Sequence, residues 1–499
     1  MKKLNRQYLL VFLAPLFLAA NCNKKDSSPE PPPPPPSPLV FTGARLDNTG
    51  ALTAATNYNV RPGVSIKLSF NNAVDRSTTS TAVSLKENGT TTVAVNYTYE
   101  NNDSTVVITP TASLKYLTRY VVTAITSLKS SKGGSLLTQA TVTIITQIDS
   151  TDKFPLISDN ALLDLVQQQT FKYFWDYGHP VSGLARERSN ATPETVTTGG
   201  SGFGIMGIPV AIQRGFITRA QGLSRMQTIV SFLKNTAQKF HGAFPHWMNG
   251  TTGVVIPFSQ KDNGADLVET SFMVAGLLTV RQYFDGADPA ETTLRTDINT
   301  IWNGVEWNWF RKSNENVLYW HWSPNYNWDM NHKIQGWNEC LITYIMAASS
   351  TTYGIPQAVY REGFARNGAM INNSTYYGYQ LPFGPSNGGP LFWAHYSFLG
   401  INPNGLTDIY GNYQTQVTNH TKINYEYCKA NPRGYFGYSN QCWGLTASDV
   451  PGGYNANEPN NDIGVISPTA ALSSFPYTPA ESMNALKFFY YKLGDKIWK

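Results

Sequence analysis

The stretch Gly264-Ala-Asp-Leu-Val-Glu-Thr-Ser-Phe-Met-Val-Ala-Gly-Leu-Leu278 carries two carboxylic acids through a run of apolar residues. At 3.6 residues per turn, Asp266, Glu269 and Thr270 fall on one face of a helix, and apolar side chains cover the other faces. Burial would raise the pKa of at least one acid towards neutrality, which suits a general acid. Hydrogen-bonded acids at an exposed helix start explain the pattern equally well. The stretch predicts a helical domain and makes Glu269 the first candidate for chemistry.

Helical spacing continues through the second part of the chain, from residue 151 to residue 499. Apolar residues recur at this spacing in Ala161 to Trp175, Ala220 to Phe240, Ala265 to Phe284, Glu291 to Phe310, Trp337 to Ala348 and Pro479 to Tyr491. The connections are long and rich in Gly, Asn and aromatic residues. Paired helices arranged as an all-α toroid, with loops that form a ligand site at one end, fit this pattern.

Residues 39–148 instead alternate with the period of a β-strand. Examples are Val64 to Phe70, Val93 to Tyr99, Thr105 to Thr109, Tyr120 to Thr123 and Thr141 to Thr146. Short strands at this spacing predict a β-sandwich, and the segment resembles a bacterial Ig-like module. It contains no Trp, because all 12 tryptophans lie between Trp175 and Trp498. A spacer or docking role is therefore expected for it, and any chemistry belongs to the helical domain.

The first residues have the pattern of a secretory leader. Positive charge precedes an apolar stretch from Tyr8 to Ala20 that is too short to span a bilayer. The segment Leu18-Ala-Ala-Asn-Cys22 resembles a lipobox, so residues 1–22 are expected to be a lipoprotein signal peptide and Cys22 the lipidated residue. Residues 23–38 form a Pro-rich linker. We expect an extracytoplasmic protein, lipid-anchored in the periplasm or at the outer-membrane surface; ordinary secretion is the alternative.

Charge and cysteine content exclude several classes of protein. The formal net charge is +5 and only 14% of residues are charged, so nucleic acid is not an expected partner. We expect a monomer. Cys340, Cys428 and Cys442 have no metal-like spacing; Cys428 and Cys442 form a disulfide or remain free thiols. The glycine-rich run from Gly199 to Gly204 is interpreted as tight packing ahead of a helix rather than a nucleotide loop. No cofactor and no metal are expected.

Aromatic and polar residues gather in the predicted loops, as in proteins that bind oligosaccharides. Cleavage of a glycosidic bond needs one carboxylic acid as proton donor and a second carboxylate. Glu269 is the candidate donor, and Glu187 and Asp462 are the other catalytic candidates. Structural ion pairs or helix caps are the competing explanation for these acids. The candidate substrate-binding residues are Arg186, Arg188, His246, Trp247, Asp266, Trp337, Glu339, His395, Tyr425, Trp443, Asp449 and Glu458.

Five motifs in order resemble the glucoamylase-like domain of glycoside hydrolase family 144. They are Gly199-Gly-Ser-Gly-Phe-Gly-Ile-Met206, Ala265-Asp-Leu-Val-Glu-Thr-Ser-Phe272, Gly336-Trp-Asn-Glu-Cys340, Cys442-Trp-Gly-Leu-Thr-Ala-Ser448 and Gly464-Val-Ile-Ser-Pro-Thr-Ala-Ala471. The resemblance runs from about Phe154 to the C-terminus. It implies an (α/α)6 toroid, endo-acting hydrolysis of β-1,2-glucan with inversion, and no metal requirement; some relatives trim disaccharides from chain ends. It supports Glu269 as catalytic acid and places the Arg186-Glu187-Arg188 turn at the substrate.

Two other functions remain open from the sequence. A surface glycan-binding protein without turnover is one, because family members continue past the position of Lys499 with a further loop and a closing helix, so a C-terminal truncation is one interpretation of this chain. A polysaccharide lyase on the same toroid is the other, with His395 as base and Tyr396 as acid.

Overall fold

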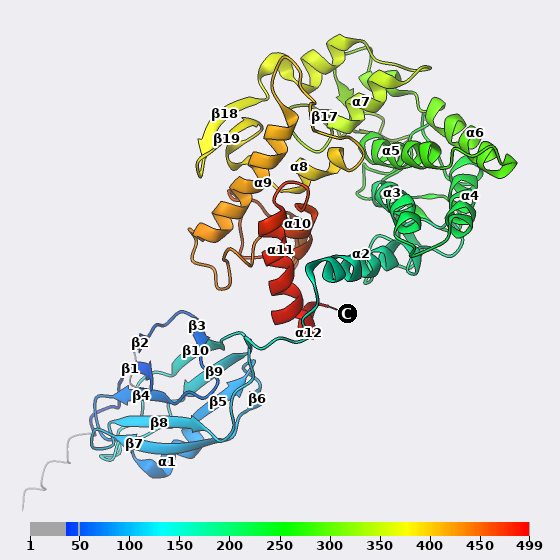
Figure 1. Cartoon of the computed structure of the whole chain (residues 1–499). Helices are drawn as coiled ribbons and strands as arrows, with labels where there is room; N and C mark the ends of the chain where they lie inside the picture. The colour runs from blue at the N-terminus through cyan, green and yellow to red at the C-terminus, as the bar shows by residue number, and fades with distance from the viewer. Residues whose placement is uncertain (1–35, 48–49, 499) are drawn as a thin grey trace, which may run out of the picture. The chain divides into compact units, whose positions relative to one another are not determined.

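The structure, a computed structural model, describes residues 36–47 and 50–498. The predicted signal peptide, the lipidation site Cys22 and most of the Pro-rich linker lie outside these residues. The chain divides into two compact units between Gln147 and Ile148 (Figure 1). In the described part of the chain, no helix has the length and apolar character needed to cross a membrane.

The first unit is a sandwich of two sheets, each with five strands among the described residues. One sheet has the order β2-β1-β4-β8-β7 and the other the order β3-β10-β9-β5-β6. Their strands are β1 (Phe41–Leu46), β2 (Ala51–Leu52), β3 (Asn57–Val60), β4 (Ile66–Phe70), β5 (Val83–Glu87), β6 (Thr91–Thr92), β7 (Val95–Glu100), β8 (Thr105–Pro110), β9 (Arg119–Ala124) and β10 (Ala140–Thr146), with helix α1 (Arg76–Ala82) before β5. Alternate residues of β4 and β10 are buried, which confirms the predicted period of two.

The second unit is helical, with short strands in its loops. Its helices are α2 (Asp159–Trp175), α3 (Thr198–Gln213), α4 (Arg219–Asn235), α5 (Leu267–Tyr283), α6 (Pro289–Asn303), α7 (Leu341–Ser349), α8 (Phe392–His395), α9 (Tyr413–Ala430), α10 (Pro468–Ser473), α11 (Pro479–Lys487) and α12 (Gly494–Ile497). Its strands are β11 (Thr195–Thr197), β12 (Trp247–Asn249), β13 (Val255–Ile256), β14 (Ala265–Asp266), β15 (Leu318–Tyr319), β16 (His321–Trp322), β17 (Lys333–Ile334), β18 (Ile371–Tyr376), β19 (Tyr379–Phe383), β20 (Ala447–Val450) and β21 (Gly453–Ala456). The longer helices follow one another in chain order around an arc (Figure 1).

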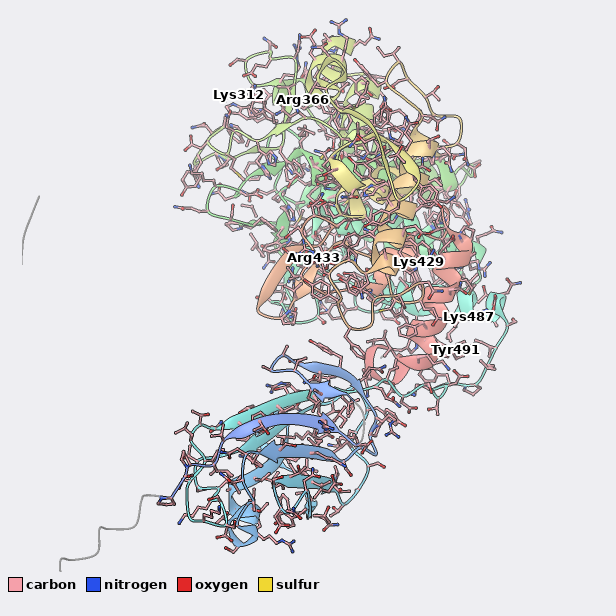
Figure 2. All side chains as sticks on the ribbon, turned by 90° about the vertical axis from the view of Figure 1, so that its left-hand side faces the viewer. Lys312, Arg366, Lys429, Arg433, Lys487 and Tyr491 are labelled. Carbon is pink, nitrogen blue, oxygen red and sulfur yellow. The ribbon has the colours of Figure 1, made fainter. Side chains whose placement is uncertain are left out.

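The two ends of this arc meet. Leu162 of α2 is buried in one apolar cluster with Leu486 of α11 and Tyr490. Lys487 forms an ion pair of 2.7 Å with Asp159, and the Ile157 N–H donates to the Tyr491 hydroxyl at 3.2 Å. Figure 2 shows Lys487 and Tyr491 together beside the last helices. Helix α2 therefore packs against α11 and the residues that follow it, and this contact joins the two ends of the arc.

Several predicted helix boundaries were wrong. The predicted helix from Ala220 to Phe240 ends at Asn235. The predicted helix from Glu291 to Phe310 breaks at Gly304, and a separate 3-10 helix follows at Trp307–Arg311. The glycine run from Gly199 to Gly204 lies inside α3 rather than ahead of a helix. Glycine is unfavourable within a helix, so close packing has to explain its presence there.

Candidate active site

Glu269 lies in the first turn of α5, and Asp266 is the residue that caps this helix. The Asp266 Oδ1 accepts hydrogen bonds from the backbone N–H of Val268 at 3.0 Å and of Glu269 at 2.9 Å. An aspartate is favoured at this position because its oxygen satisfies N–H groups that have no partner within the helix. The cap fixes where α5 begins, and hence where Glu269 emerges.

The N-terminus of α3 faces the Glu269 carboxyl. The Gly199 N–H donates to Glu269 Oε2 at 2.7 Å. A Cβ atom at residue 199 would lie 2.1 Å from that oxygen, so only glycine allows the contact. The positive end of the helix dipole favours a negative charge at this place.

Glycines also let α3 and α5 approach closely. A Cβ at Gly202 would lie 2.3 Å from the Phe272 carbonyl oxygen, and one at Gly276 would lie 2.3 Å from the Gly202 carbonyl oxygen. The two backbones therefore touch at both positions. This packing explains the glycine run of α3 and holds Gly199 against Glu269.

Two histidines and a third acid continue from Asp266. The His246 Nδ1 lies 2.9 Å from Asp266 Oδ2. His321 of β16 pairs with Asp266 of β14, and its Nε2 lies 3.6 Å from Asp266 Oδ2 and 3.4 Å from Asp262 Oδ2. Asp266 is fully buried and Asp262 is 4% exposed. We call Asp262, Asp266, His246 and His321 the histidine–aspartate chain.

The surroundings of Glu269 and Asp266 shift the pKa values of these two acids in opposite directions. Burial raises the pKa of Glu269 to about 7, and the negative charges of Asp266 and Glu187 add to this rise, against the opposing charge of His246 and the Gly199 N–H. Burial also disfavours a charged Asp266, but the hydrogen bonds and positive charges of His246 and His321 keep its pKa below the ordinary range. One buried acid is therefore a proton donor near neutrality, and its neighbour stays ionised.

Further acids from other loops surround Glu269. The Glu339 pKa is raised to about 7, by burial first and also by the charges of Glu269 and Asp266, against its own backbone N–H. Glu187 is electrostatically coupled to Glu269, and its Oε1 lies 3.0 Å from an Arg188 nitrogen. Arg188 also reaches Asp449 of β20 at 2.9 Å. We call Glu187, Glu269 and Glu339 the glutamate cluster.

Partly exposed rings lie beside these acids. Tyr396 packs against Phe203 and Phe272, with ring centroids 4.9 and 5.7 Å apart. Its pKa is raised by burial and by the charges of Glu269, Glu339 and Glu187. Phe258 is 50% exposed and packs on His246 at 4.2 Å and on Trp247 at 4.8 Å. Rings of this kind offer flat faces to sugars.

Several residues of this site were not among the predicted ones. Asp262 and Phe258 lie in the loop before β14, and His321 enters only through strand pairing. Tyr454 of β21 is 65% exposed and is electrostatically coupled to Arg188, Glu187 and Asp449. The spacing of acids from Asp262 to Glu269 could have indicated Asp262. No short-range pattern in the sequence marks Phe258, His321 or Tyr454.

Other predicted site residues have structural contacts instead. Asp462 is 2% exposed and accepts hydrogen bonds from the hydroxyls of Tyr427 at 3.1 Å and Tyr438 at 2.7 Å. Its carboxylate is thus committed to a buried network, and this corrects its placement with the catalytic acids. Arg186 donates to the backbone oxygens of Pro193 and Tyr177.

Predicted aromatic and histidine contacts also need correction. Trp443 is fully buried and Trp337 is 4% exposed, so neither indole offers a face to a sugar. His395 is 5% exposed and contacts the hydroxyls of Ser473 and Ser474, and burial lowers its pKa to about 3. Such a histidine is neutral and hydrogen-bonded to structural partners.

Two remaining predicted residues lie apart from the contacts described above. Tyr425 packs on the buried Trp443 with ring centroids 5.3 Å apart. Glu458 is half-buried, and burial raises its pKa. Cys340, Cys428 and Cys442 are all free thiols, so the disulfide alternative was wrong.

Among the described residues, two groups of side chains come close enough to hold a metal ion. They are His246 with Asp266 and Glu269, and Asp262 with Asp266 and His321, with donor atoms within 4.8 Å in each group. Asp266 belongs to both groups and is already engaged by His246 and two backbone N–H groups. Histidine–carboxylate contacts account for both arrangements without an ion.

Comparison with known proteins gives the class of this fold. A glucoamylase family model, Glycoamylase, matches residues 331–499, and a bacterial Ig-like domain model, Big_5, matches residues 45–146. The endo-β-1,2-glucanase of Chitinophaga pinensis, solved with sophorotriose and glucose, is 51% identical with a TM-score of 0.67; the match covers 69% of this chain and 85% of that one. The protein thus has a glucoamylase-like helical domain preceded by an Ig-like domain.

Two relatives from Parabacteroides distasonis extend the comparison. Its β-1,2-glucanase structure is 37% identical with a TM-score of 0.67, covering 93% of this chain and 66% of that one. Its exo β-1,2-glucooligosaccharide sophorohydrolase is 46% identical over 373 residues, which is 70% of this chain. This chain spans about half of the length of that curated relative (52%). The chain belongs to glycoside hydrolase family 144.

Proposed function

We propose that this protein hydrolyses β-1,2-glucan, with Glu269 as the general acid. The observation that carries the proposal is the placement of Glu269: half-buried, in contact with the N-terminus of α3, and protonatable near neutrality. The activities of the Chitinophaga and Parabacteroides relatives support the substrate class.

Glu187 is the proposed partner that activates water. Its carboxylate lies 3.0 Å from the Arg188 guanidinium, which holds it in place beside Glu269, whereas the raised pKa of Glu339 favours a protonated group that donates to sugar hydroxyls. An inverting mechanism places a water between acid and base and needs no covalent intermediate. We infer inversion and attack within the chain, on an (α/α)6 toroid closed by the contact of α2 with α11.

Leaving-group dependence separates the acid from the base. We expect Glu269→Gln to lose roughly a hundredfold to ten-thousandfold of kcat on linear β-1,2-glucan, yet to retain cleavage of a dinitrophenyl β-sophoroside, whose leaving group needs no proton. Glu187→Gln should lose both activities. Glucan binding without turnover in the unaltered protein would contradict the proposed function.

The time course of product formation tests endo against exo action. Attack within the chain lowers the viscosity of long β-1,2-glucan before much disaccharide appears, and attack at chain ends releases sophorose from the start. Proton NMR of the first products gives the anomeric configuration and hence tests inversion.

We also propose that the protein is a monomer tethered to a membrane surface by a lipid on Cys22. Metabolic labelling with a radioactive fatty acid should mark the unaltered protein and not the Cys22→Ala variant. Labelling that is equal in both would refute the anchor.

A further inference from the structure

His246 connects the fully buried Asp266 to the proposed acid. Both oxygens of Asp266 are engaged, Oδ1 by two backbone N–H groups and Oδ2 by His246. Donor atoms of His246, Asp266 and Glu269 all lie within 4.8 Å of one another. Asp266 therefore cannot turn away, and it holds His246 at Glu269.

A fully buried carboxylate needs a compensating positive charge or several hydrogen bonds. Among the described residues, the side chains that can carry a positive charge in contact with the Asp266 carboxylate are His246 and His321. Of the two, His246 makes the short contact, 2.9 Å against 3.6 Å. His246 is thus the natural holder of the compensating proton.

We propose that His246 is a positioning residue for catalysis: Asp266 holds its imidazolium against the Glu269 carboxyl, and this fixed positive charge governs when Glu269 carries its proton. The inference rests on the proposed function for the role of Glu269. In the reaction, Glu269 gives its own proton to the leaving oxygen, and the imidazolium keeps both of its protons.

The groups around His246 support a permanent positive charge. Glu269 and Asp266 face it from the start of α5, and Asp262 faces it from the preceding loop. Burial favours the neutral ring, but these three carboxylates together outweigh burial and raise the pKa of His246 to about 10. Phe258 covers the ring at 4.2 Å, which limits access of water.

The positive charge of His246 opposes several groups that raise the pKa of Glu269. Burial and the negative charges of Asp266 and Glu187 favour its protonated form, and Glu339 is a further acid coupled to it. The Gly199 N–H and His246 favour the carboxylate. Without the charge of His246, the pKa of Glu269 would be higher, and its carboxyl would hold its proton more tightly.

The first experiment measures kcat/KM for β-1,2-glucooligosaccharides against pH for the full chain and for His246→Gln. The acid must be protonated, so activity falls as pH rises through the pKa of Glu269. Loss of the imidazolium raises that pKa, so the basic limb should move up by roughly one pH unit or more. The plateau of kcat should fall, because a tighter proton is transferred less readily.

His241→Gln is the matched control. His241 also pairs with a glutamate, Glu306, at 2.9 Å and stacks on an aromatic ring, Trp309, but it has no contact with Glu269 among those the structure gives. The control should keep the pH limb of the unaltered protein. A basic limb that is unchanged in His246→Gln, with lower activity at every pH, would mean a merely structural role and would overturn the proposal.

The second experiment does not require turnover or a folded variant at position 246. NMR of the ¹⁵N-histidine-labelled protein should show an imidazolium that persists at about pH 8.5, two units above the ordinary histidine pKa of about 6.5. In Asp266→Asn this signal should titrate at lower pH. If no ring stays doubly protonated, the inference fails; if it does but no glucan is cleaved, only the proposed function fails.

A metal ion held by His246, Asp266 and Glu269 is the alternative to an imidazolium at this place. Activity that EDTA abolishes and Zn²⁺ or Mn²⁺ restores would overturn the imidazolium, because a bound ion needs neutral histidine nitrogens. Activity that is unchanged by EDTA supports the proposal.

Discussion

At Glu269, burial sets the pH range in which the carboxyl carries a proton. Burial raises the pKa of this carboxyl to about 7, so below that pH it is mostly in the protonated form that the proposed general acid requires. We expect kcat/KM of the unaltered protein to fall as pH rises through about 7, in proportion to the protonated fraction of Glu269. Initial rates at low substrate concentration across the pH range check this. A rate that rises through neutrality would instead make Glu269 a base.

Gly199 tests the contact that holds this carboxyl. In Gly199→Ala, the Cβ atom would displace Glu269 Oε2, which lies 2.1 Å from its position, so we expect kcat to fall about tenfold to a hundredfold. Gly207→Ala is the control in the same helix, because its Cβ would meet only Phe171 at 3.8 Å. That variant should keep its activity and gain about 0.5 to 1 kcal/mol of stability. Equal kcat in both variants would show that the contact at residue 199 is dispensable.

Sequence reasoning at this scale found Glu269 and Asp266 but not their partners. An acid in an apolar helix is visible as a local pattern, because residues four apart share a face. The contact of His321 with Asp262 and Asp266 depends on strand pairing over more than fifty residues, and no local pattern encodes it. Asp462 showed the reverse error, because a loop acid that binds tyrosine hydroxyls has the same local sequence as one that binds substrate.

At the scale of elements, the helix pair α3 and α5 positions the site. Backbone contact at Gly202 and Gly276 sets the distance between the two helices, and Gly199 and Glu269 lie at their starts. The structure thus explains why α3 tolerates five glycines, at positions 199, 200, 202, 204 and 207, despite their low helix propensity. Close packing of the glycine run was predicted, but the run was expected ahead of the helix and lies inside α3.

Gly276→Ala should separate the pair. Its Cβ would lie 2.3 Å from the Gly202 carbonyl oxygen, and neither backbone can yield cheaply. We expect a loss of about 3 kcal/mol in the free energy of unfolding of the helical unit, at the upper end of overpacking effects. Urea unfolding followed by tryptophan fluorescence measures this. No loss of stability in Gly276→Ala, or a gain like the one expected for Gly207→Ala, would show that α3 and α5 can move apart freely.

At the scale of the whole molecule, two units with separate cores are joined near Gln147. Leu162 is fully buried where α2 meets α11, so Leu162→Ala should cost the helical unit about 2 to 5 kcal/mol. The sandwich should be unaffected, because its core contains none of these residues. Tryptophan fluorescence reports only the helical unit, since all 12 tryptophans lie there, and far-ultraviolet circular dichroism reports both. A single shifted transition by both probes would contradict independent units.

The two-part organisation could be predicted from the chain alone, because the periods of strands and helices show in the local spacing of apolar residues. The five ordered motifs also predicted the family, which the comparisons confirm, and an acid in an apolar helix made Glu269 the candidate proton donor. Folding was needed to show which acids meet, which aromatic rings are buried, and how Asp262, His321, Asp266 and His246 lie beside Glu269. Those contacts join loops far apart in the chain, and the charge on each group depends on neighbours that folding brings together.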